Sequence, residues 1–180
     1  RGVRPDLAKA IMRTNTTAIA AVMVHRGEAD SMICGTFGEY RWHLNYIEEV
    51  LCDPAQHAQG ALSLMILEDG PLFIADTHVH TAPTPEQITQ SVVGAARHVR
   101  RFGLQPKIAL CARSQFGSMQ GDTGLRLRDA IAQLDLMDLD FQYEGEMNID
   151  AALDPELRAR VMPQNRMDGI ANVLIFAHAD

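Results

Sequence analysis

Short apolar runs alternate with longer segments of helical periodicity along most of this chain, and this alternation constrains the fold more than any other feature. Alternating β and α units need crossover connections, which produce parallel strands with helices packed on the faces of the sheet. The sequence therefore predicts an α/β protein, with three α/β/α layers and a mostly parallel, partly mixed sheet. The predicted strands are 31–34, 61–67, 72–75, 107–112, 139–143 and 172–176.

The segment between Thr84 and Gly103 carries the clearest helix signals. Thr84 is a predicted N-cap, Pro85 occupies the first helical position, and Gln87 completes a capping box. Gly103 suits the left-handed residue that ends a helix. Further helices are predicted over 5–26, with a break at 15–17, and over 40–51, 122–134 and 155–161.

Two strand predictions bear on the sheet and on the cysteines. The tetrapeptide Glu68-Asp69-Gly70-Pro71 joins two strand-like runs and predicts a hairpin, which would add an antiparallel pair. The run 31–34 follows a turn and predicts a short buried strand. Cys34 there, and Cys111 in the run 107–112, are therefore expected to be small core residues.

Composition limits the classes of partner. A net charge of -7 argues against nucleic acid or an anionic membrane as the main partner. Three cysteines without paired spacing suit a reducing, cytoplasmic setting. We find no signal peptide, and the apolar runs are too short to span a bilayer. Because the chain starts at Arg1 rather than Met, and a predicted core strand lies close to its end, we expect a piece of a longer polypeptide.

The segment from Asp76 to His80 allows two incompatible interpretations. His78 and His80 are two residues apart after a predicted strand and would share one face, as in several metal-dependent hydrolases. That site needs further ligands, and of the other histidines only His178 follows a strand. A barrel hydrolase also needs far more than 180 residues. Alternatively, both histidines flank a capped helix and one bonds to the backbone.

The loop 113–121 (RSQFGSMQG) is the main candidate for a ligand site. It follows one predicted strand and precedes a helix, and ligands of parallel sheets collect beyond the carboxyl ends of the strands. Free N–H groups at a helix N-terminus favour anions. Arg113 supplies a cation, Ser114 and Ser118 supply hydroxyl groups, and Gly117 permits close backbone approach. On composition alone, a solvated loop without a ligand is an equal alternative.

An acidic cluster, Glu144-Gly145-Glu146-Met147, follows the predicted strand 139–143, with Asp150 soon after. Paired carboxylates can perform acid–base catalysis. They can equally pair with Arg166 or cap the next helix, and the residues alone favour this structural role.

Taken in order, these segments resemble the phosphate acetyltransferase (phosphotransacetylase) family. The matching runs are collinear and cover most of the chain. They are 27–36 (GEADSMICGT), 75–87 (ADTHVHTAPTPEQ), 101–110 (RFGLQPKIAL), 114–118 (SQFGS), 145–152 (GEMNIDAA) and 169–176 (GIANVLIF). The details of 26–36, 40–47 (YRWHLNYI) and 114–118 look more like the phosphotransacetylase-like C-terminal domain of large bacterial NADP-dependent malic enzymes.

This resemblance implies a fold, a ligand and a parent protein. The chain would be a fragment, 1–180, of a phosphotransacetylase-like domain that lacks the family's N-terminal strands and C-terminal end. The parent's N-terminal malic enzyme domains would make pyruvate from malate with NADP and a divalent metal. The appended domain would bind acetyl-CoA as an inhibitory effector and help to assemble a homo-oligomer, without being catalytic itself. By motif position, the cofactor-binding residues would be Arg113, Ser114, Phe116, Gly117, Ser118 and Arg166.

The chain departs from the family's pattern where acyl transfer is concerned. Active acetyltransferases usually follow the last strand with a Phe-Pro-Asp-Leu-type motif, whereas this chain has Phe176-Ala177-His178-Ala179-Asp180. His80 replaces an Asn that is common in the family, and Cys111-Ala112-Arg113 replaces a stretch richer in hydroxyl groups. The alternatives that stay open are an active phosphate acetyltransferase and an assembly module without a ligand.

Overall fold

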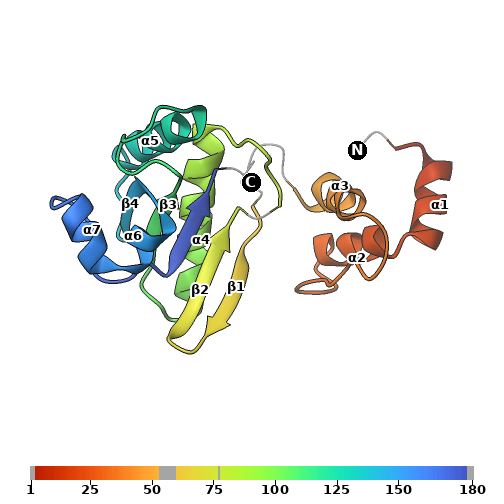
Figure 1. Cartoon of the computed structure of the whole chain (residues 1–180). Coiled ribbons are helices and arrows are strands. Elements are labelled where there is room, and N and C mark those ends of the chain that lie inside the picture. The colour runs from red at the N-terminus through yellow and green to blue at the C-terminus, as the bar shows by residue number, and fades with distance from the viewer. Residues whose placement is uncertain (1–2, 53–59, 77, 178–180) are drawn as a thin grey trace. The chain divides into compact units, whose positions relative to one another are not determined.

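The structure is a computed structural model that describes residues 3–52, 60–76 and 78–177 (Figure 1). The chain divides into two compact units, Arg1–His57 and Ala58–Asp180. Each unit is described by itself.

The first unit consists of helices α1 (Pro5–Thr14), α2 (Thr16–His25) and α3 (Tyr40–Leu51). The predicted break at 15–17 is confirmed, because Asn15 ends α1 and its side chain caps α2 by accepting a hydrogen bond from Ala18 N at 2.9 Å. Helices α2 and α3 are joined by the buried His43, whose Nδ1 lies 2.7 Å from the Thr17 hydroxyl.

The predicted buried strand over 31–34 is wrong. This run forms neither a strand nor a helix, Ile33 is 98% exposed, and Cys34 is exposed rather than part of a core. A strand needs a neighbouring strand for its backbone hydrogen bonds. The described part of this unit contains helices but no strand, so the apolar run has no partner there.

The second unit is built on one sheet of five described strands, with the order β1-β2-β5-β3-β4. The pair β1–β2 is antiparallel and the other pairs are parallel, so the predicted hairpin and mixed sheet are confirmed. The strand bounds are β1 Ser63–Leu67, β2 Gly70–Ala75, β3 Lys107–Cys111, β4 Gln142–Met147 and β5 Val173–Phe176.

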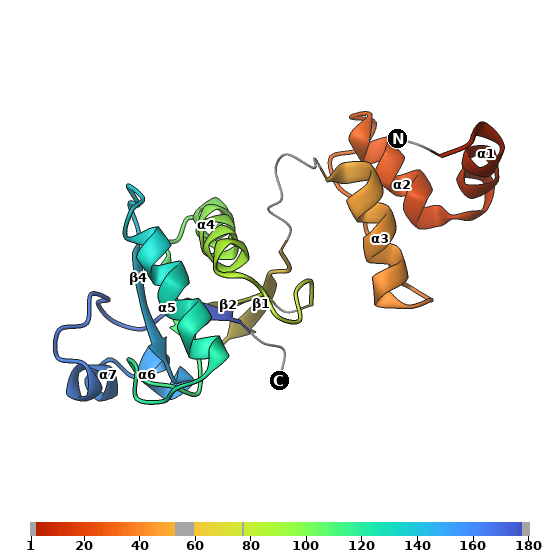
Figure 2. The same ribbon diagram turned by 90° about the horizontal axis from the view of Figure 1, so that it is seen from above.

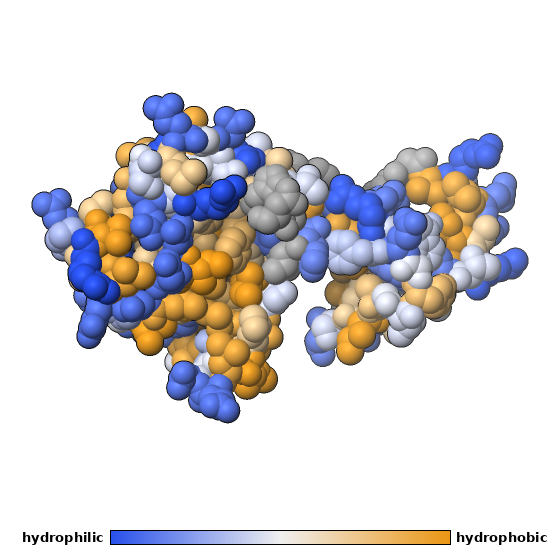
Figure 3. All heavy atoms as spheres, viewed as in Figure 1, coloured by the Kyte–Doolittle hydropathy of each residue, from blue (hydrophilic) through white to orange (hydrophobic). Residues whose placement is uncertain are grey.

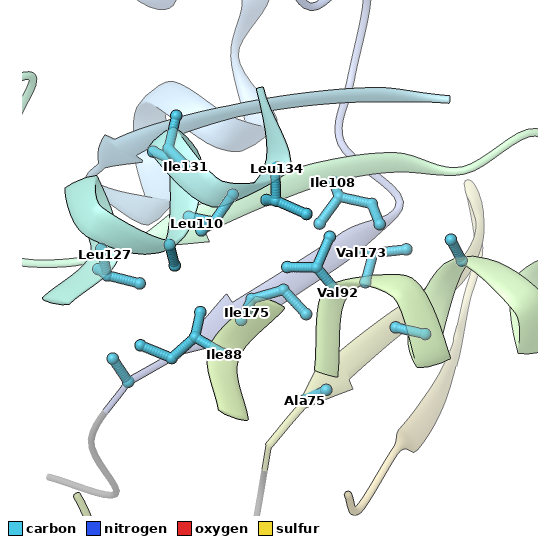
Figure 4. Close-up of a cluster of buried hydrophobic side chains, with 14 of the residues drawn as sticks. Ala75, Ile88, Val92, Ile108, Leu110, Leu127, Ile131, Leu134, Val173 and Ile175 are labelled. Atoms are coloured by element: carbon cyan, nitrogen blue, oxygen red, sulfur yellow. The ribbon is translucent and has the colours of Figure 1, made fainter. Parts of the chain in front are cut away.

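Helices cover both faces of this sheet and give the predicted three-layer fold (Figure 2). On one face, α4 (Pro85–Arg101) and α5 (Asp122–Leu134) pack over the buried residues Ile108, Leu110, Val173 and Ile175 (Figure 4). On the other face, α6 (Ile149–Leu153) packs over Ala109, Cys111 and Leu174, and α7 (Pro155–Val161) packs on α6. Alternate residues of the same strands thus serve two cores, as the pleat of a strand requires.

The caps of α4 form as predicted. Thr84 accepts a hydrogen bond from Gln87 N at 3.3 Å, and the Gln87 side chain accepts one from Thr84 N at 2.9 Å, which completes the capping box. Gly103 follows the helix with a φ of 76°. These hydrogen bonds satisfy backbone amides at the start of α4, and so they fix the point at which the helix begins after the loop that follows β2.

The fourth strand is displaced from its prediction, and α6 was not predicted. The sequence suggested a strand over 139–143 with the acidic cluster beyond it, but β4 covers Gln142–Met147 and contains the cluster. Both glutamates, Glu144 and Glu146, are buried. The apolar pattern failed here because both carboxylates bond to partners distant in sequence, which a local pattern cannot show.

No described helix combines the length and the apolar character needed to cross a bilayer. Apolar surface gathers over the β1–β2 hairpin (Figure 3), where Leu64, Met65, Ile66 and Leu67 are all at least 40% exposed.

Candidate functional site

A cleft of about 900 Å³ opens at the carboxyl ends of β3 and β5. Four segments line it, namely 111–114 after β3, 119–124 at the start of α5, 148–150 at the start of α6, and 176–177 after β5. The cleft thus lies where the predicted ligand loop meets the first turn of α5. Its volume is in the range of pockets that hold cofactor-sized molecules, and its position is the usual one for ligands of parallel sheets.

Arg113 is the main cation of the cleft. It lines the cavity, is exposed, and forms no ion pair with any residue in the described ranges. Asp122 and Asp150 line the same cleft, so its lining carries charges of both signs. A guanidinium without a carboxylate partner is suited to bind phosphate through charge-assisted hydrogen bonds.

The loop that follows Arg113 is folded back onto one buried carboxylate. The Oε1 atom of Glu146 accepts hydrogen bonds from the Ser114 hydroxyl at 2.6 Å and from Gly117 N at 2.8 Å. The Arg128 guanidinium of α5 donates to the same oxygen at 3.0 Å. Glu146 is fully buried, and Ser114 is only 5% exposed. The donors that the sequence assigned to a ligand are therefore used inside the protein.

The backbone of the loop is shaped for this contact. Phe116 has a φ of 48° and Gly117 a φ of 84°, so two successive residues are left-handed. Phe116 N donates to the Glu146 carbonyl oxygen at 2.7 Å. A bulky residue adopts positive φ only where its surroundings hold it there. Of these two amides, the Gly117 N–H donates to the Glu146 side chain and the Phe116 N–H donates to the Glu146 main chain, so the turn is held against one residue of the protein.

The register of β4 explains why Glu146 points into this loop. Leu110 pairs with Gly145, but the next residue of β3, Cys111, pairs with Met147, so Glu146 is the extra residue of a bulge. A β-bulge re-aims a side chain that would otherwise follow the pleat. Gly145 permits the close approach, because a Cβ there would lie 2.6 Å from the Leu110 carbonyl oxygen.

The predicted cofactor-binding residues do not all come together. Arg113 and Ser114 line the cleft, whereas Phe116, Gly117 and Ser118 are not among its lining residues. Phe116 packs against the core on the α6 face of the sheet, and the Ser118 hydroxyl accepts a hydrogen bond from Gln115 N at 2.9 Å. These three residues therefore belong to the loop but not to the lining of the cleft.

Arg166 is not brought to the cleft. Its guanidinium pairs with Asp135 at 2.6 Å and lies over the Tyr143 ring, 5.0 Å from the ring centroid. Its backbone N donates to Glu144 Oε2 at 2.6 Å, so the predicted pairing of the acidic cluster with Arg166 is confirmed. Burial lowers the pKa of Arg166, but the hydrogen bond and charge of Asp135, together with Glu144, raise it overall. The Arg166 guanidinium is therefore already paired with the carboxylates of Asp135 and Glu144.

The two histidines after β2 do not form a metal cluster within the described ranges. No group of three His, Cys, Asp or Glu side chains with suitable geometry occurs there, and His178 lies outside the described residues. The His80 ring bonds to the Asp76 carboxylate at 2.6 Å rather than to the backbone. Burial alone would raise the pKa of Asp76, but hydrogen bonds from Ala61 N, the His80 ring, Val79 N and His80 N lower it overall.

Sequence reasoning missed Glu146 as the centre of the loop, together with Arg128 and Asn148. With its side-chain amide in the orientation that satisfies its hydrogen bonds, Asn148 donates to Ala112 O at 2.8 Å and to Arg113 O at 3.0 Å. The one available signal was the glycine between two glutamates in an otherwise strand-like run, which often marks a bulge.

Comparisons with known proteins agree with this architecture. The family described as phosphate acetyl/butaryl transferase matches residues 1–179. The chain is 41% identical to an NAD-dependent malic enzyme of Rhizobium meliloti and 40% identical to an NADP-dependent malic enzyme of Salmonella typhimurium. These matches cover 99% and 100% of the chain, which spans only 23% and 24% of the relatives' length.

Phosphate acetyltransferases match as well. The one from Synechocystis is 30% identical over 98% of this chain and 25% of its own length. A solved phosphotransacetylase from Streptococcus pyogenes superposes with a TM-score of 0.86, over 97% of this chain and 54% of that one, at 23% identity. This structural likeness bears on the fold alone, whereas the family match extends along nearly the whole sequence. The chain therefore belongs to the phosphate acetyl/butaryl transferase family.

Proposed function

We propose that this chain is the acetyl-CoA-binding regulatory and oligomerisation domain of a bacterial NADP-dependent malic enzyme. Its partners are the N-terminal malic enzyme domains of the same polypeptide, which use NADP and a divalent metal to convert malate to pyruvate. The assembled protein is a cytoplasmic homo-oligomer. The sequence identity to malic enzymes supports the proposal. About two residues in five are identical over nearly the whole of this chain, which spans only about a quarter of the length of those enzymes.

The cleft lined by Arg113 is the observation that supports acetyl-CoA as the ligand. Coenzyme A is a long molecule with several phosphate charges, and a cleft of about 900 Å³ has room for a substantial part of it. Arg113 supplies a cation, while Met119, Ile149 and Phe176 supply apolar surface for the uncharged arm. One positive anchor together with apolar walls matches the chemistry of an acyl-CoA.

Calorimetric titration with acetyl-CoA tests this ligand. Replacing Arg113 by alanine removes the charge-assisted contact and is expected to weaken binding about tenfold. Arg101→Ala is the matched control, because Arg101 is also exposed, lies at the end of α4, and does not line the cleft. If the two variants bind acetyl-CoA with equal affinity, Arg113 is not part of the binding site. If the unmodified protein gives no heat of binding at millimolar acetyl-CoA, the domain is a scaffold without a ligand.

Regulation requires that acetyl-CoA bind one arrangement of the assembled subunits better than another. The full polypeptide should then oxidise malate more slowly in the presence of acetyl-CoA. Where acetyl-CoA lowers the affinity for malate, malate should lower the affinity for acetyl-CoA by the same factor. Malate oxidation that is insensitive to acetyl-CoA, although calorimetry shows binding, would contradict the regulatory role and leave only a ligand site.

An active phosphate acetyltransferase is the second candidate. Family membership and the relative from Synechocystis favour it. In that reaction the thiol of CoA attacks acetyl phosphate, acetyl-CoA forms, and phosphate leaves. Formation of acetyl-CoA by the full polypeptide at an ordinary enzymatic rate, about 10 per second, would replace the regulatory proposal.

A further inference from the structure

We infer that Glu146 is a built-in anion, which permanently fills the anion-binding turn at Ser114–Gly117. The turn therefore shapes the wall of the cleft and does not bind the phosphates of a ligand. This inference deepens the proposed function, because it leaves Arg113 as the cation that meets the ligand. The inference that a carboxylate of the protein fills the turn does not depend on which ligand binds in the cleft.

The donors around Glu146 are those of a phosphate site. One hydroxyl, one backbone amide from a pair of left-handed residues and one guanidinium converge on Oε1, at 2.6, 2.8 and 3.0 Å. Neutral donors of this kind, together with an arginine, are typical of sites that bind phosphate or carboxylate. The turn therefore has the chemistry that its sequence suggested, but its anion is Glu146.

The burial of Glu146 makes this occupancy permanent. The side chain is fully buried and does not line the cleft, and of its three donors only Ser114 does. The carboxylate is also held by the main chain, since the bulge places it and Gly145 fits against Leu110 with no room for a Cβ. A tethered anion competes at a high effective concentration, which a free phosphate ester does not match.

Ser114 and Gly117 are consequently positioning residues. The Ser114 hydroxyl also lies 3.2 Å from Met119 N, so the contact with Glu146 fixes both ends of the segment that leads into α5. Met119 and the following residues line the cleft. The shape of the cleft wall thus depends on a carboxylate that the ligand does not touch.

Chemical rescue tests whether Glu146 acts as an anion in a site. Glu146→Ala should lower the melting temperature by about 10 °C, because Arg128 and two further donors lose their partner. Formate at about 100 mM should enter the space left by the side chain and restore a few degrees, relative to chloride at equal ionic strength. Glu144→Ala is the matched control. That glutamate is also buried, but its partner Arg166 keeps a second carboxylate, Asp135 at 2.6 Å, so formate should give a smaller recovery.

A second variant covers the case in which Glu146→Ala does not fold. Glu146→Gln fills the same space and still offers one acceptor, so it should fold with a melting temperature lowered by about 4 °C and show no recovery with formate. An unchanged melting temperature in Glu146→Gln, or equal effects of formate on the Glu146→Ala and Glu144→Ala variants, would overturn the inference.

Nuclear magnetic resonance of the Gly117 amide separates this inference from the proposed ligand. In the unmodified protein, acetyl-CoA should leave the amide proton hydrogen-bonded to Glu146 and its resonance nearly unshifted. A large shift on binding would show that the turn meets the ligand, and would refute permanent occupancy. If acetyl-CoA fails to bind at all, the proposed function fails, while the formate experiment still decides the role of Glu146.

Discussion

Two passages from a strand to a helix can be compared directly in the second unit, one from β2 to α4 and one from β3 to α5. Each is organised around a single buried carboxylate. In the first passage Asp76 belongs to the passage itself, and it accepts hydrogen bonds from Val79 N at 3.2 Å and His80 N at 3.0 Å. In the second passage Glu146 belongs to β4, and its partner Ser114 lies 32 residues earlier.

The difference shows how far a loop can be understood from its own residues. The first passage carries its organising group within five residues, as Asp residues in turns commonly do. The second supplies two donors, Ser114 and Gly117, and their acceptor arrives through the pairing of β3 with β4. A loop rich in donors is therefore as consistent with an internal acceptor as with an external ligand, and only the sheet register distinguishes the two.

The largest expected effect comes from disturbing that register. Gly145→Ala would place a Cβ 2.6 Å from the Leu110 carbonyl oxygen, so the strands must separate at the bulge. We expect a loss of about 3 kcal/mol in the free energy of unfolding, measured by urea denaturation. Gly94→Ala is the control, because a Cβ there meets nothing within 4 Å. It should be neutral or add up to about 1 kcal/mol, since alanine favours helix.

The local passage should lose less when its own carboxylate is changed. Asp76→Asn keeps one acceptor but loses the charge and part of the contact with His80, so about 2 kcal/mol of unfolding free energy should be lost. Protection of the amides of 113–121 against hydrogen exchange should be unchanged. Faster exchange in both passages would show that the two carboxylates are not independent.

The same variant has a defined dependence on pH. Hydrogen bonds lower the pKa of Asp76 in the folded protein, despite the opposing effect of burial. A group whose pKa is depressed on folding stabilises the protein above its unfolded pKa, and this contribution is lost as the pH falls through the folded value. The difference between the unmodified protein and Asp76→Asn should therefore be constant above about pH 5 and shrink below about pH 4. A difference that grows on acidification would contradict this assignment.

A smaller effect is expected where the first passage enters its helix. Thr84→Ala removes one half of the capping box of α4 and should cost about 1 kcal/mol by thermal or urea unfolding. Thr84→Ser keeps the hydroxyl and serves as the control. A loss as large as that of Asp76→Asn would mean that the cap, rather than the carboxylate, organises this passage.

The smallest expected effect is a change in the reactivity of Cys111, which reports how often the second passage opens. Cys111 ends β3 just before the loop, and its burial raises the pKa of its thiol to about 12. Cys34 is exposed. Iodoacetamide should therefore label Cys34 and spare Cys111 in the native protein, as read by mass spectrometry, and Gly145→Ala should speed up labelling of Cys111. Rapid labelling of Cys111 in the unmodified protein would show that the loop opens freely.

The sequence predicted those parts of the fold whose signals are local. The capping box of α4, the hairpin of β1 and β2, the bounds of α5 and the break at Asn15 all depend on neighbouring residues, and all are confirmed. The run 31–34 failed because an apolar pattern indicates a strand only if another strand is present to pair with it. The start of β4 failed because its polar residues are satisfied across the sheet.

The structure has a cleft where the sequence placed its candidate site, and two of the predicted residues line it. The position of the loop after β3 followed from the rule for parallel sheets, and Arg113 and Ser114 do line the cleft there. The role of Ser114 and the position of Arg166 depend on which acidic group each one meets. Both acidic partners come from other segments of the chain, so no local pattern could assign them.

The outer strand β1 has a practical consequence for anyone who handles this chain. Among the described strands it has a neighbour on one side only, so a row of amide and carbonyl groups faces outward. Ile66, which is 86% exposed, belongs to this strand. At high concentration, the molecules should therefore associate through their β1 edges. Ile66→Lys should keep them dispersed, because a charge on the rim repels a second strand without disturbing the interior.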